Sequence, residues 1–438
     1  MSGTQKKAVP LVVILAMAVL AAQVSIAFLL SQSPTKAWAV ALGFVGLVCV
    51  LTLPRSILTL ALPATYLYYR VGPASTEISL ADVMLGVALV AALPFVPWRS
   101  PVLRSMLRIV ALYLLVLAIA IIAVPSKRAV IEWGHRAFLA GGGVVVGAAI
   151  AQTTLLAVRA LRAFLAASAV VAAGAIFDAL AHWGSGTFPA PAYPFGIHKN
   201  AAGFLLACAL LVLIVAPGFV ALPRILKAPA IALLFTGMAA CQSRGAVIAL
   251  VSVLVVWVLY ERRITISPLV LVGAALLIAM TYFTINATFA SDTNDGAARF
   301  NSVNSRVATY DAALRLWRHD PLVGVGLKFW RDPALAAQTA FGEPHDLVVS
   351  ALAESGLIGL SGLVVLVVGG LVVVRRSRAQ LAALAGAILL ANVVDSLVGI
   401  YWVAGTLTFA WIVAGLACGE RSVPGPARED VLAARAAS

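Results

Sequence analysis

Charged residues are scarce in this sequence, and their scarcity excludes an ordinary soluble fold. Only 11% of the 438 residues are charged and 62% are hydrophobic, which gives a mean hydropathy of +1.03. Soluble domains carry about 25% charged residues, so this much apolar surface needs lipid to bury it. The net charge of +14 comes mostly from basic residues in short segments between apolar runs. That placement is typical of membrane proteins, and we expect no nucleic-acid partner.

Metal and nucleotide motifs are also lacking. The four cysteines lie far apart in apolar stretches, which predicts neither a disulfide framework nor a cysteine metal site. They are Cys49, Cys208, Cys241 and Cys418. The sequence has no HxH or HExxH pattern and no glycine-rich nucleotide loop. We therefore expect no cofactor and no tightly bound catalytic metal.

Apolar runs are abundant, and many can cross a bilayer as helices of about 20 residues. We predict an all-α polytopic membrane protein with 12–14 transmembrane helices. The candidate runs are 8–30, 37–53, 56–70, 79–97, 108–125, 137–153, 160–181, 200–218, 228–242, 245–260, 264–285, 346–374, 379–397 and 400–418.

The basic residues predict the orientation of these helices. With the N-terminus in the cytoplasm, most of the 31 basic residues face the cytoplasm, so both termini are expected there. The first helix follows Lys6 and Lys7 and is expected to be retained. We divide the chain into an N-terminal helix bundle, a long outer loop, C-terminal helices and a cytoplasmic tail. Their bounds are 1–285, 286–345, 346–418 and 419–438.

The long outer loop is hydrophilic but rich in aromatic residues, so we expect it to be ordered. Apolar residues at helical spacing predict an amphipathic helix over 303–319, lying on the membrane or on the bundle. They are Val303, Val307, Tyr310, Leu314 and Trp317. Asp320-Pro321 should end this helix, and Gly324 and Gly326 should make a turn.

Ionisable residues beside the apolar runs fall at one level, the outer face, in this topology. Together they predict a polar cavity that opens outward, although each alone could be an interfacial side chain or a helix-packing hydrogen bond. They are Asp82, Asp178, Arg244, His345, Glu354, Asp395 and the run His198-Lys199-Asn200.

Two arginines and a histidine are the strongest candidates for substrate binding and catalysis. Arg244 interrupts an apolar stretch and Arg306 opens the amphipathic helix. Two guanidinium groups facing one cavity would bind a diphosphate; the alternatives are a salt bridge for Arg244 and a solvated helix charge for Arg306. His345 stands where loop and membrane meet, and it suits proton transfer or is polar surface. Glu354 lies about two and a half turns further on, faces elsewhere and is expected to be structural.

The run 243–360 carries an ordered set of motifs around the long loop. They are Ser243-Arg244-Gly245, Asn304-Ser305-Arg306 with Tyr310, Asp320-Pro321-Leu322-Val323-Gly324-Val325-Gly326, Pro344-His345-Asp346 and Glu354-Ser355-Gly356-Leu357-Ile358-Gly359. In this set the chain resembles the O-antigen ligase and Wzy-type polymerase superfamily of bacterial envelope enzymes. One departure is Asp346, where the family usually has asparagine.

The resemblance implies a C-type, metal-independent, inverting membrane glycosyltransferase. It would move a glycan from undecaprenyl diphosphate to an acceptor glycan or lipid A core on the periplasmic face of the bacterial inner membrane. Arg244 and Arg306 would bind the diphosphate, and His345 would accept or orient the acceptor proton. Possible further substrate contacts are His198, Lys199, Asn200, Arg136 and Asp395.

Several alternatives remain open at this point. A Wzy-type polymerase of O-antigen or exopolysaccharide is not separated from a ligase by sequence. A peptidoglycan polymerase of the shape-and-division class would also have one large outer loop, but its loop does not match. A transporter or lipid-linked glycan flippase would need a site at the bilayer midplane and usually a repeat, where charge is scarce here.

Overall fold

The computed structural model describes residues 52–71, 78–184, 190–261, 302–332, 335, 343–377, 379–400 and 402–419. Within these residues the protein is all-α, and its one extended pairing is an antiparallel bridge between Arg70 and Ser79. The described residues from Leu58 onward belong to one compact unit.

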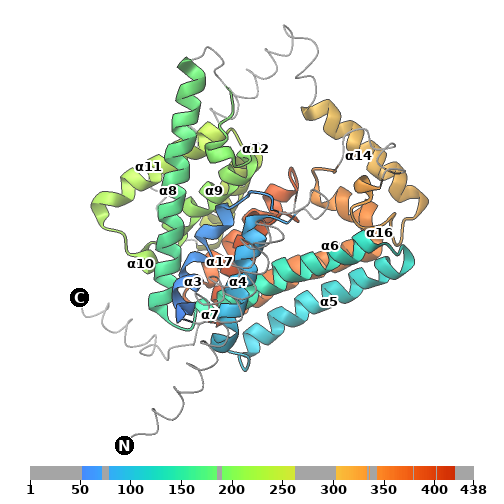
Figure 1. Ribbon diagram of the computed structural model, residues 1–438, viewed down its shortest axis with the longest axis horizontal. Helices are drawn as coiled ribbons and strands as arrows, with labels where there is room; N and C mark the ends of the chain where they lie inside the picture. The colour runs from blue at the N-terminus through green and yellow to red at the C-terminus, as the bar shows by residue number, and fades with distance from the viewer. Residues whose placement is uncertain are drawn as a thin grey trace, which may run out of the picture. The chain divides into compact units, whose positions relative to one another are not determined.

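The helices are drawn in Figure 1. Their bounds are α3 (Pro54–Leu60), α4 (Leu80–Ala92), α5 (Pro101–Ala123), α6 (Lys127–Ala137), α7 (Gly143–Ile150), α8 (Thr154–Gly184), α9 (Lys199–Val215), α10 (Pro217–Val220), α11 (Arg224–Cys241), α12 (Arg244–Glu261), α14 (Ser302–His319), α16 (Leu347–Arg376), α17 (Ala382–Ser396) and α18 (Thr406–Gly419). Short 3-10 turns lie at Pro63–Tyr66, Leu93–Phe95, Pro194–Gly196 and Phe329–Arg331, and a π-helical segment at Phe138–Gly142.

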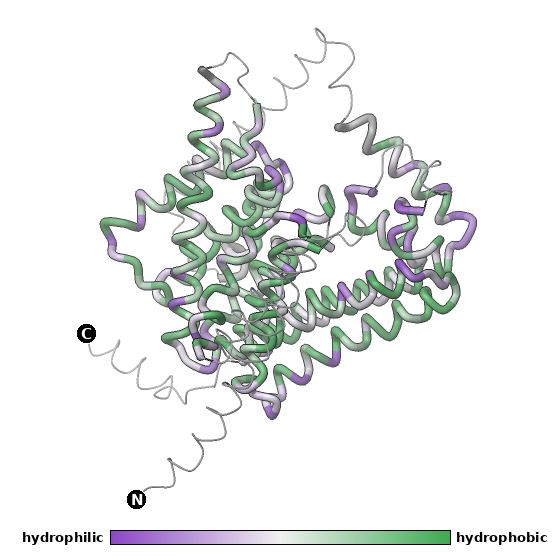
Figure 2. The backbone as a smooth tube through the Cα atoms, in the orientation of Figure 1, coloured by the Kyte–Doolittle hydropathy of each residue, from purple (hydrophilic) through white to green (hydrophobic). Residues whose placement is uncertain are grey.

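This is a polytopic membrane protein. Four described helices, α5, α8, α11 and α16, are long and apolar enough to cross a membrane, and five shorter apolar helices accompany them. Hydrophobic residues predominate along the helices, whereas hydrophilic residues gather at helix ends and around α14 (Figure 2). The predicted runs 8–30, 264–285 and most of 37–53 lie outside the described residues. The helix total of 12–14 stays a prediction.

Two predicted segments differ from the structure. The run 56–70 is broken into α3 and a 3-10 turn that begins at Pro63, because proline cannot donate a helical hydrogen bond. The segment 127–136, expected to be an outer loop, is helix α6. The Ser126 hydroxyl caps α6 by accepting from the Ala129 N–H at 3.0 Å.

Helix α16 is interrupted at Gly356, whose φ of 61° and ψ of −161° are open to glycine alone. The interruption frees backbone groups, and the loop 320–326 satisfies them. The N–H groups of Val325 and Gly326 donate to the carbonyls of Ala353 and Glu354 at 2.9 and 3.1 Å. The N–H groups of Leu357 and Ile358 donate to the carbonyls of Pro321 and Leu322 at 2.9 and 3.1 Å.

The predicted amphipathic helix is present as α14, and it ends at His319, before Asp320-Pro321. The turn predicted after it is confirmed by the positive φ of Gly324 and Gly326. However, the predicted apolar stripe is only partly buried, since Tyr310, Leu314 and Trp317 are half-buried and Val307 is 59% exposed. The buried face instead carries the smaller residues Thr309 and Ala313 with Leu316, which lets α14 pack closely against α16.

Helices α7 and α18 approach each other at backbone distance. Each has two glycines four residues apart, Gly143 and Gly147 in α7 and Gly415 and Gly419 in α18. A Cβ on Gly147 would collide with the Ile412 carbonyl, and one on Gly415 with the Val144 carbonyl. Small residues at this spacing are the usual means of close helix contact in membranes.

We predict that Gly147→Ala lowers the stability of the purified protein in detergent by about 1–3 kcal/mol, because the added methyl has no space. Gly134→Ala in α6 is the matched control, since nothing lies within 4 Å of its Cβ position. Thermal unfolding followed by tryptophan fluorescence measures both. Equal midpoints for the two variants would show that the α7–α18 contact is looser than described.

Candidate functional site

A buried arginine organises the inward face of α6. Arg136 is 3% exposed, and its guanidinium donates to Glu132 Oε1 at 3.0 Å, to Glu354 Oε2 at 2.6 Å and to the Tyr113 hydroxyl at 3.3 Å. Its Cζ lies over the Trp402 ring, 4.7 Å from the ring centroid. Arg136 is thus fully engaged by the protein, as a buried arginine must be.

Lys328 completes this group from the loop between α14 and α16. Its Nζ lies 2.9 Å from Glu132 Oε2, and its backbone N–H donates to Glu354 Oε1 at 3.0 Å. Glu132, Arg136, Lys328 and Glu354 form what we call the Arg136 cluster. It contains two carboxylates and two cations. His135 extends it through a 3.0 Å contact between its Nε2 and Asp82 Oδ1.

Hydrogen bonds to its backbone hold the segment before α16, which contains His345. The Tyr310 hydroxyl of α14 donates to the His345 carbonyl at 2.8 Å, and the Ser350 hydroxyl donates to the Pro344 carbonyl at 2.9 Å. Asp346 caps α16, because its Oδ1 accepts from Val348 and Val349, each at 2.8 Å. Asparagine caps a helix as well as aspartate does, so the departure at Asp346 leaves this local structure intact.

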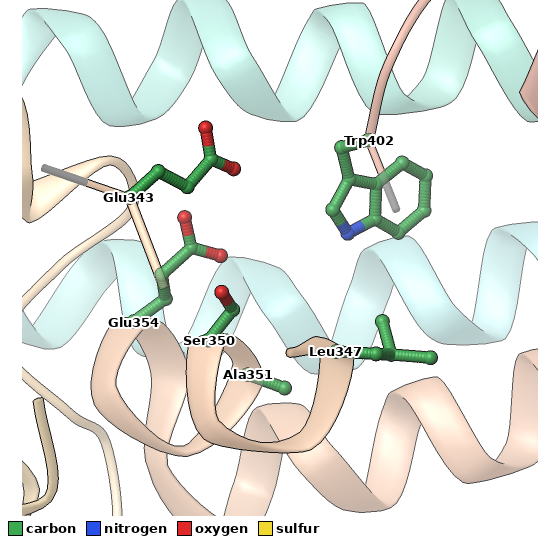
Figure 3. A pocket seen from close by; sticks show the side chains of 6 residues that line it. All are labelled: Glu343, Leu347, Ser350, Ala351, Glu354 and Trp402. Atoms are coloured by element: carbon green, nitrogen blue, oxygen red, sulfur yellow. The ribbon is translucent and has the colours of Figure 1, made fainter. Parts of the chain in front are cut away.

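A small crevice lies beside the segment that carries His345. Its lining is mainly the first turns of α16, with Trp402 opposite and two carboxyl groups at one end (Figure 3). The lining residues are Glu343, Leu347, Ser350, Ala351, Glu354 and Trp402. Burial, and then the charge of Glu354, raise the pKa of Glu343 to about 8, so this carboxyl is largely protonated at neutral pH.

A second polar group gathers where α12 begins. Arg244 is the first residue of α12 and is half-buried. Within the part of the chain that the structure describes, its guanidinium has no hydrogen bond or ion pair. Asp395, near the end of α17, lies against the next residue, since a Cβ on Gly245 would collide with its carboxylate.

The start of α9 lies at the same end of the bundle. His198 caps α9, its Nδ1 accepting from the Asn200 N–H at 3.4 Å, and Lys199 is the first helical residue. Burial, and then the charge of Lys199, lower the pKa of His198. Lys199 is also close enough to Cys241, the last residue of α11, to act on it electrostatically. Arg244, Asp395 and the run 198–200 are what we call the Arg244 group.

The structure places most of the predicted residues in or beside these two polar groups. The Arg244 group contains five of them, and the other side holds His345, Glu354 and Arg136. Tyr68 lies between the two sides, within electrostatic range of the Asp82, Glu343 and Asp395 carboxylates. Arg306 lies in α14, one turn before Tyr310 on the same helix face, and only its backbone is described.

Sequence reasoning missed several members of the site. Glu132, Lys328, Glu343 and Trp402 were not singled out, and Arg136 was placed in a loop. The spacing of Glu132 and Arg136, four residues apart, was the available signal, because such a pair faces one side of a helix. Asp178 also has a local partner, since it accepts from the Tyr193 N–H at 2.7 Å. Among the described residues, no group of three His, Cys, Asp or Glu is placed to hold a metal ion.

We predict that Glu354→Gln destabilises the protein by about 3–5 kcal/mol, because Arg136 then keeps a buried charge without its closest partner. The matched control is Asp311→Asn, which breaks the exposed pair with Arg315 and should cost about 1 kcal/mol or less. Unfolding titrations in mixed micelles measure both. A Glu354 variant as stable as the Asp311 variant would contradict the importance of the cluster.

The raised pKa of Glu343 predicts a pH dependence. A carboxyl whose folded pKa rises from 4.5 to about 8 contributes stability below pH 4.5, and this contribution is lost as the pH rises through 8. Wild type should therefore lose stability between about pH 5 and 8.5 relative to Glu343→Gln. Thermal midpoints of both proteins across this range measure the difference. Parallel curves would show that Glu343 titrates normally.

Comparison with known proteins concerns the second half of the chain. Residues 229–364 match a family model described as O-antigen ligase. The match contains Arg244, Arg306, His345 and both motifs that meet at the break in α16. No curated protein matches the chain. Residues 229–364 are thus similar to the O-antigen ligase family, which supports the resemblance to the O-antigen ligase and Wzy-type polymerase superfamily.

Proposed function

We propose that this protein transfers a glycan from undecaprenyl diphosphate to an acceptor sugar on the periplasmic face of the inner membrane. The favoured reaction is that of an O-antigen ligase, with lipid A core as the acceptor. The observation that carries the proposal is Arg244, a half-buried arginine at a helix start without a partner among the described residues. It lies within the family match. A diphosphate would supply the missing negative charge.

The proposed chemistry is one displacement at the anomeric carbon. The acceptor hydroxyl oxygen forms a bond to this carbon as the bond to the diphosphate oxygen breaks, which inverts the centre. The bonding electrons leave on the diphosphate, whose growing charge Arg244 and Arg306 offset. His345 accepts the hydroxyl proton. His198, Lys199, Asn200 and Asp395 surround the diphosphate end in this scheme.

Arg136 takes a different part in the proposal from the one expected. Its donors are used by Glu132, Glu354 and Tyr113, so we propose that it supports the site rather than contacts the substrate. Glu354 keeps the structural part expected of it. Together they fix α6 and the loop carrying Lys328 against the start of α16, where His345 lies.

We predict that Arg244→Ala or His345→Ala abolishes glycan transfer without reducing the amount of protein in the membrane. Removing one such electrostatic donor typically costs about 10²–10³-fold in rate. Arg244→Lys should recover part of the activity, because an ammonium keeps the charge but loses the two-pronged geometry. The measurement is the surface glycan profile, on a gel, of a deletion strain that carries each variant.

Exposed residues of the same types provide the controls. Arg224→Ala, at the start of α11, and His319→Ala, at the end of α14, should behave as wild type. In the deletion strain, long chains absent from lipid A core but present on the carrier lipid indicate a ligase. Single repeats on the core indicate the alternative, a polymerase. An unchanged glycan profile contradicts glycan transfer and favours the transporter or flippase.

A further inference from the structure

Tyr68 lies between the two polar groups of the site, in the segment that leads into α4. The carboxylate of Asp395, which belongs to the Arg244 group, acts on the Tyr68 hydroxyl electrostatically. So do the carboxylates of Asp82 and Glu343, which lie on the side of the Arg136 cluster. This tyrosine is therefore placed to reach a ligand that extends from one group to the other.

The backbone and the ring of Tyr68 are firmly held. Its N–H donates to the Tyr66 carbonyl at 2.8 Å, and the carbonyl of the next residue, Tyr69, accepts from the Leu80 N–H at 2.7 Å. The ring packs against Gly405, since a Cβ on this glycine would lie 3.2 Å from Tyr68 Cε2. The protein thus fixes the direction of the hydroxyl before any ligand binds, which is how binding sites limit the entropy lost on binding.

The Tyr68 hydroxyl itself is not used by the described part of the protein. A tyrosine hydroxyl away from bulk water usually has a hydrogen-bond partner. That of Tyr66 donates to Ser168 at 2.8 Å, and that of Tyr310 donates to the His345 carbonyl at 2.8 Å. The half-buried Tyr68 hydroxyl has no hydrogen bond to a described residue, and it is not enclosed by the protein either. It is therefore available to a ligand.

The surroundings of this hydroxyl favour a neutral partner. Burial, and then the charges of Asp395, Asp82 and Glu343, raise the pKa of Tyr68, whereas Arg70 opposes them as the smallest cause. The hydroxyl therefore keeps its proton and can donate one hydrogen bond and accept others. Because carboxylates outnumber the cation here, a second anion is disfavoured at this point. The hydroxyl group of a sugar is neutral and complements the phenol in both directions.

The proposed reaction requires a sugar in this position. The reacting sugar is bonded to the diphosphate at Arg244 and is attacked by the acceptor hydroxyl at His345, so it lies between these two side chains. Both of them and Tyr68 are half-buried, so each keeps part of its surface open to a ligand. We propose that the Tyr68 hydroxyl hydrogen-bonds a hydroxyl of this sugar, the first sugar of the lipid-linked glycan. This inference rests on the proposed function and names a further residue that contacts the donor.

The test uses the purified protein in nanodiscs, with lipid-linked glycan and lipid A core extracted from the deletion strain. Tyr68→Phe removes one oxygen and keeps the ring against Gly405. Its kcat/KM for the lipid-linked glycan should fall about tenfold, as expected for the loss of one hydrogen bond. The KM for lipid A core should stay at its wild-type value. So should the inhibition constant of undecaprenyl diphosphate, because this probe has no sugar.

Tyr66→Phe is the matched control, two residues earlier in the chain. It removes a hydroxyl that is bonded to Ser168 in the core, so it should lower the unfolding midpoint and leave the kinetic constants unchanged. Tyr68→Phe should show the reverse, because the hydroxyl that it removes has no hydrogen bond to a described residue. This crossed result separates a substrate contact from a structural role.

Each other outcome overturns a stated part of the proposal. A wild-type kcat/KM for the lipid-linked glycan in Tyr68→Phe overturns the sugar contact while leaving glycan transfer intact. Weaker inhibition by undecaprenyl diphosphate assigns the hydroxyl to the diphosphate, and a raised KM for lipid A core alone assigns it to the acceptor; both overturn the contact with the donor sugar. A wild-type protein that transfers nothing to lipid A core or to a second lipid-linked glycan contradicts the proposed function and the contact together.

Discussion

The break in α16 is the constraint on which the rest of the site depends. A helix interrupted in an apolar setting leaves N–H and C=O groups that water cannot satisfy there, and each would cost several kcal/mol if left unpaired. The loop 320–326 supplies hydrogen bonds to both sides of the break at Gly356. This exchange fixes the loop, which in turn brings Lys328 to Glu132 and Glu354. The motif at 320–326 and the motif at 354–359 are thus the two sides of one backbone contact.

Side-chain hydrogen bonds also join the helices around the break in α16. Arg136 joins α6 to α16 through Glu354, and Tyr310 joins α14 to the segment that carries His345. These contacts pair the charges of the Arg136 cluster with one another, whereas Glu343, beside it, has no hydrogen bond or ion pair to a described residue. The Arg244 group differs in charge, because its arginine has no hydrogen bond or ion pair to a described residue.

The parts predicted from sequence are those with local signals. The amphipathic helix, its end at Asp320-Pro321 and the helix starts at Lys199 and Arg244 were predicted, because proline, glycine and capping residues act within a few positions of the chain. The Arg136 cluster was not predicted, because Arg136 and Glu354 are 218 residues apart. Helix α6 was predicted to be a loop because its charged residues suggested exposure to water, whereas two of them, Glu132 and Arg136, are buried. The break at Gly356 leaves no trace in hydropathy.

The π-helical segment at Phe138–Gly142 has a consequence for how α6 and α7 pack. A π turn holds an extra residue, and one residue corresponds to about 100° of rotation around a helix axis. The wide turn therefore offsets the phase of α6, whose buried stripe is Ala129, Glu132 and Arg136, from that of α7, which is buried on every side. The continuous helix of α6 and α7 can then pack a polar face against the start of α16 and a glycine face against α18. The α7 part of this helix keeps its glycine contact with α18, while the α6 part turns Glu132 and Arg136 toward Glu354 and Lys328.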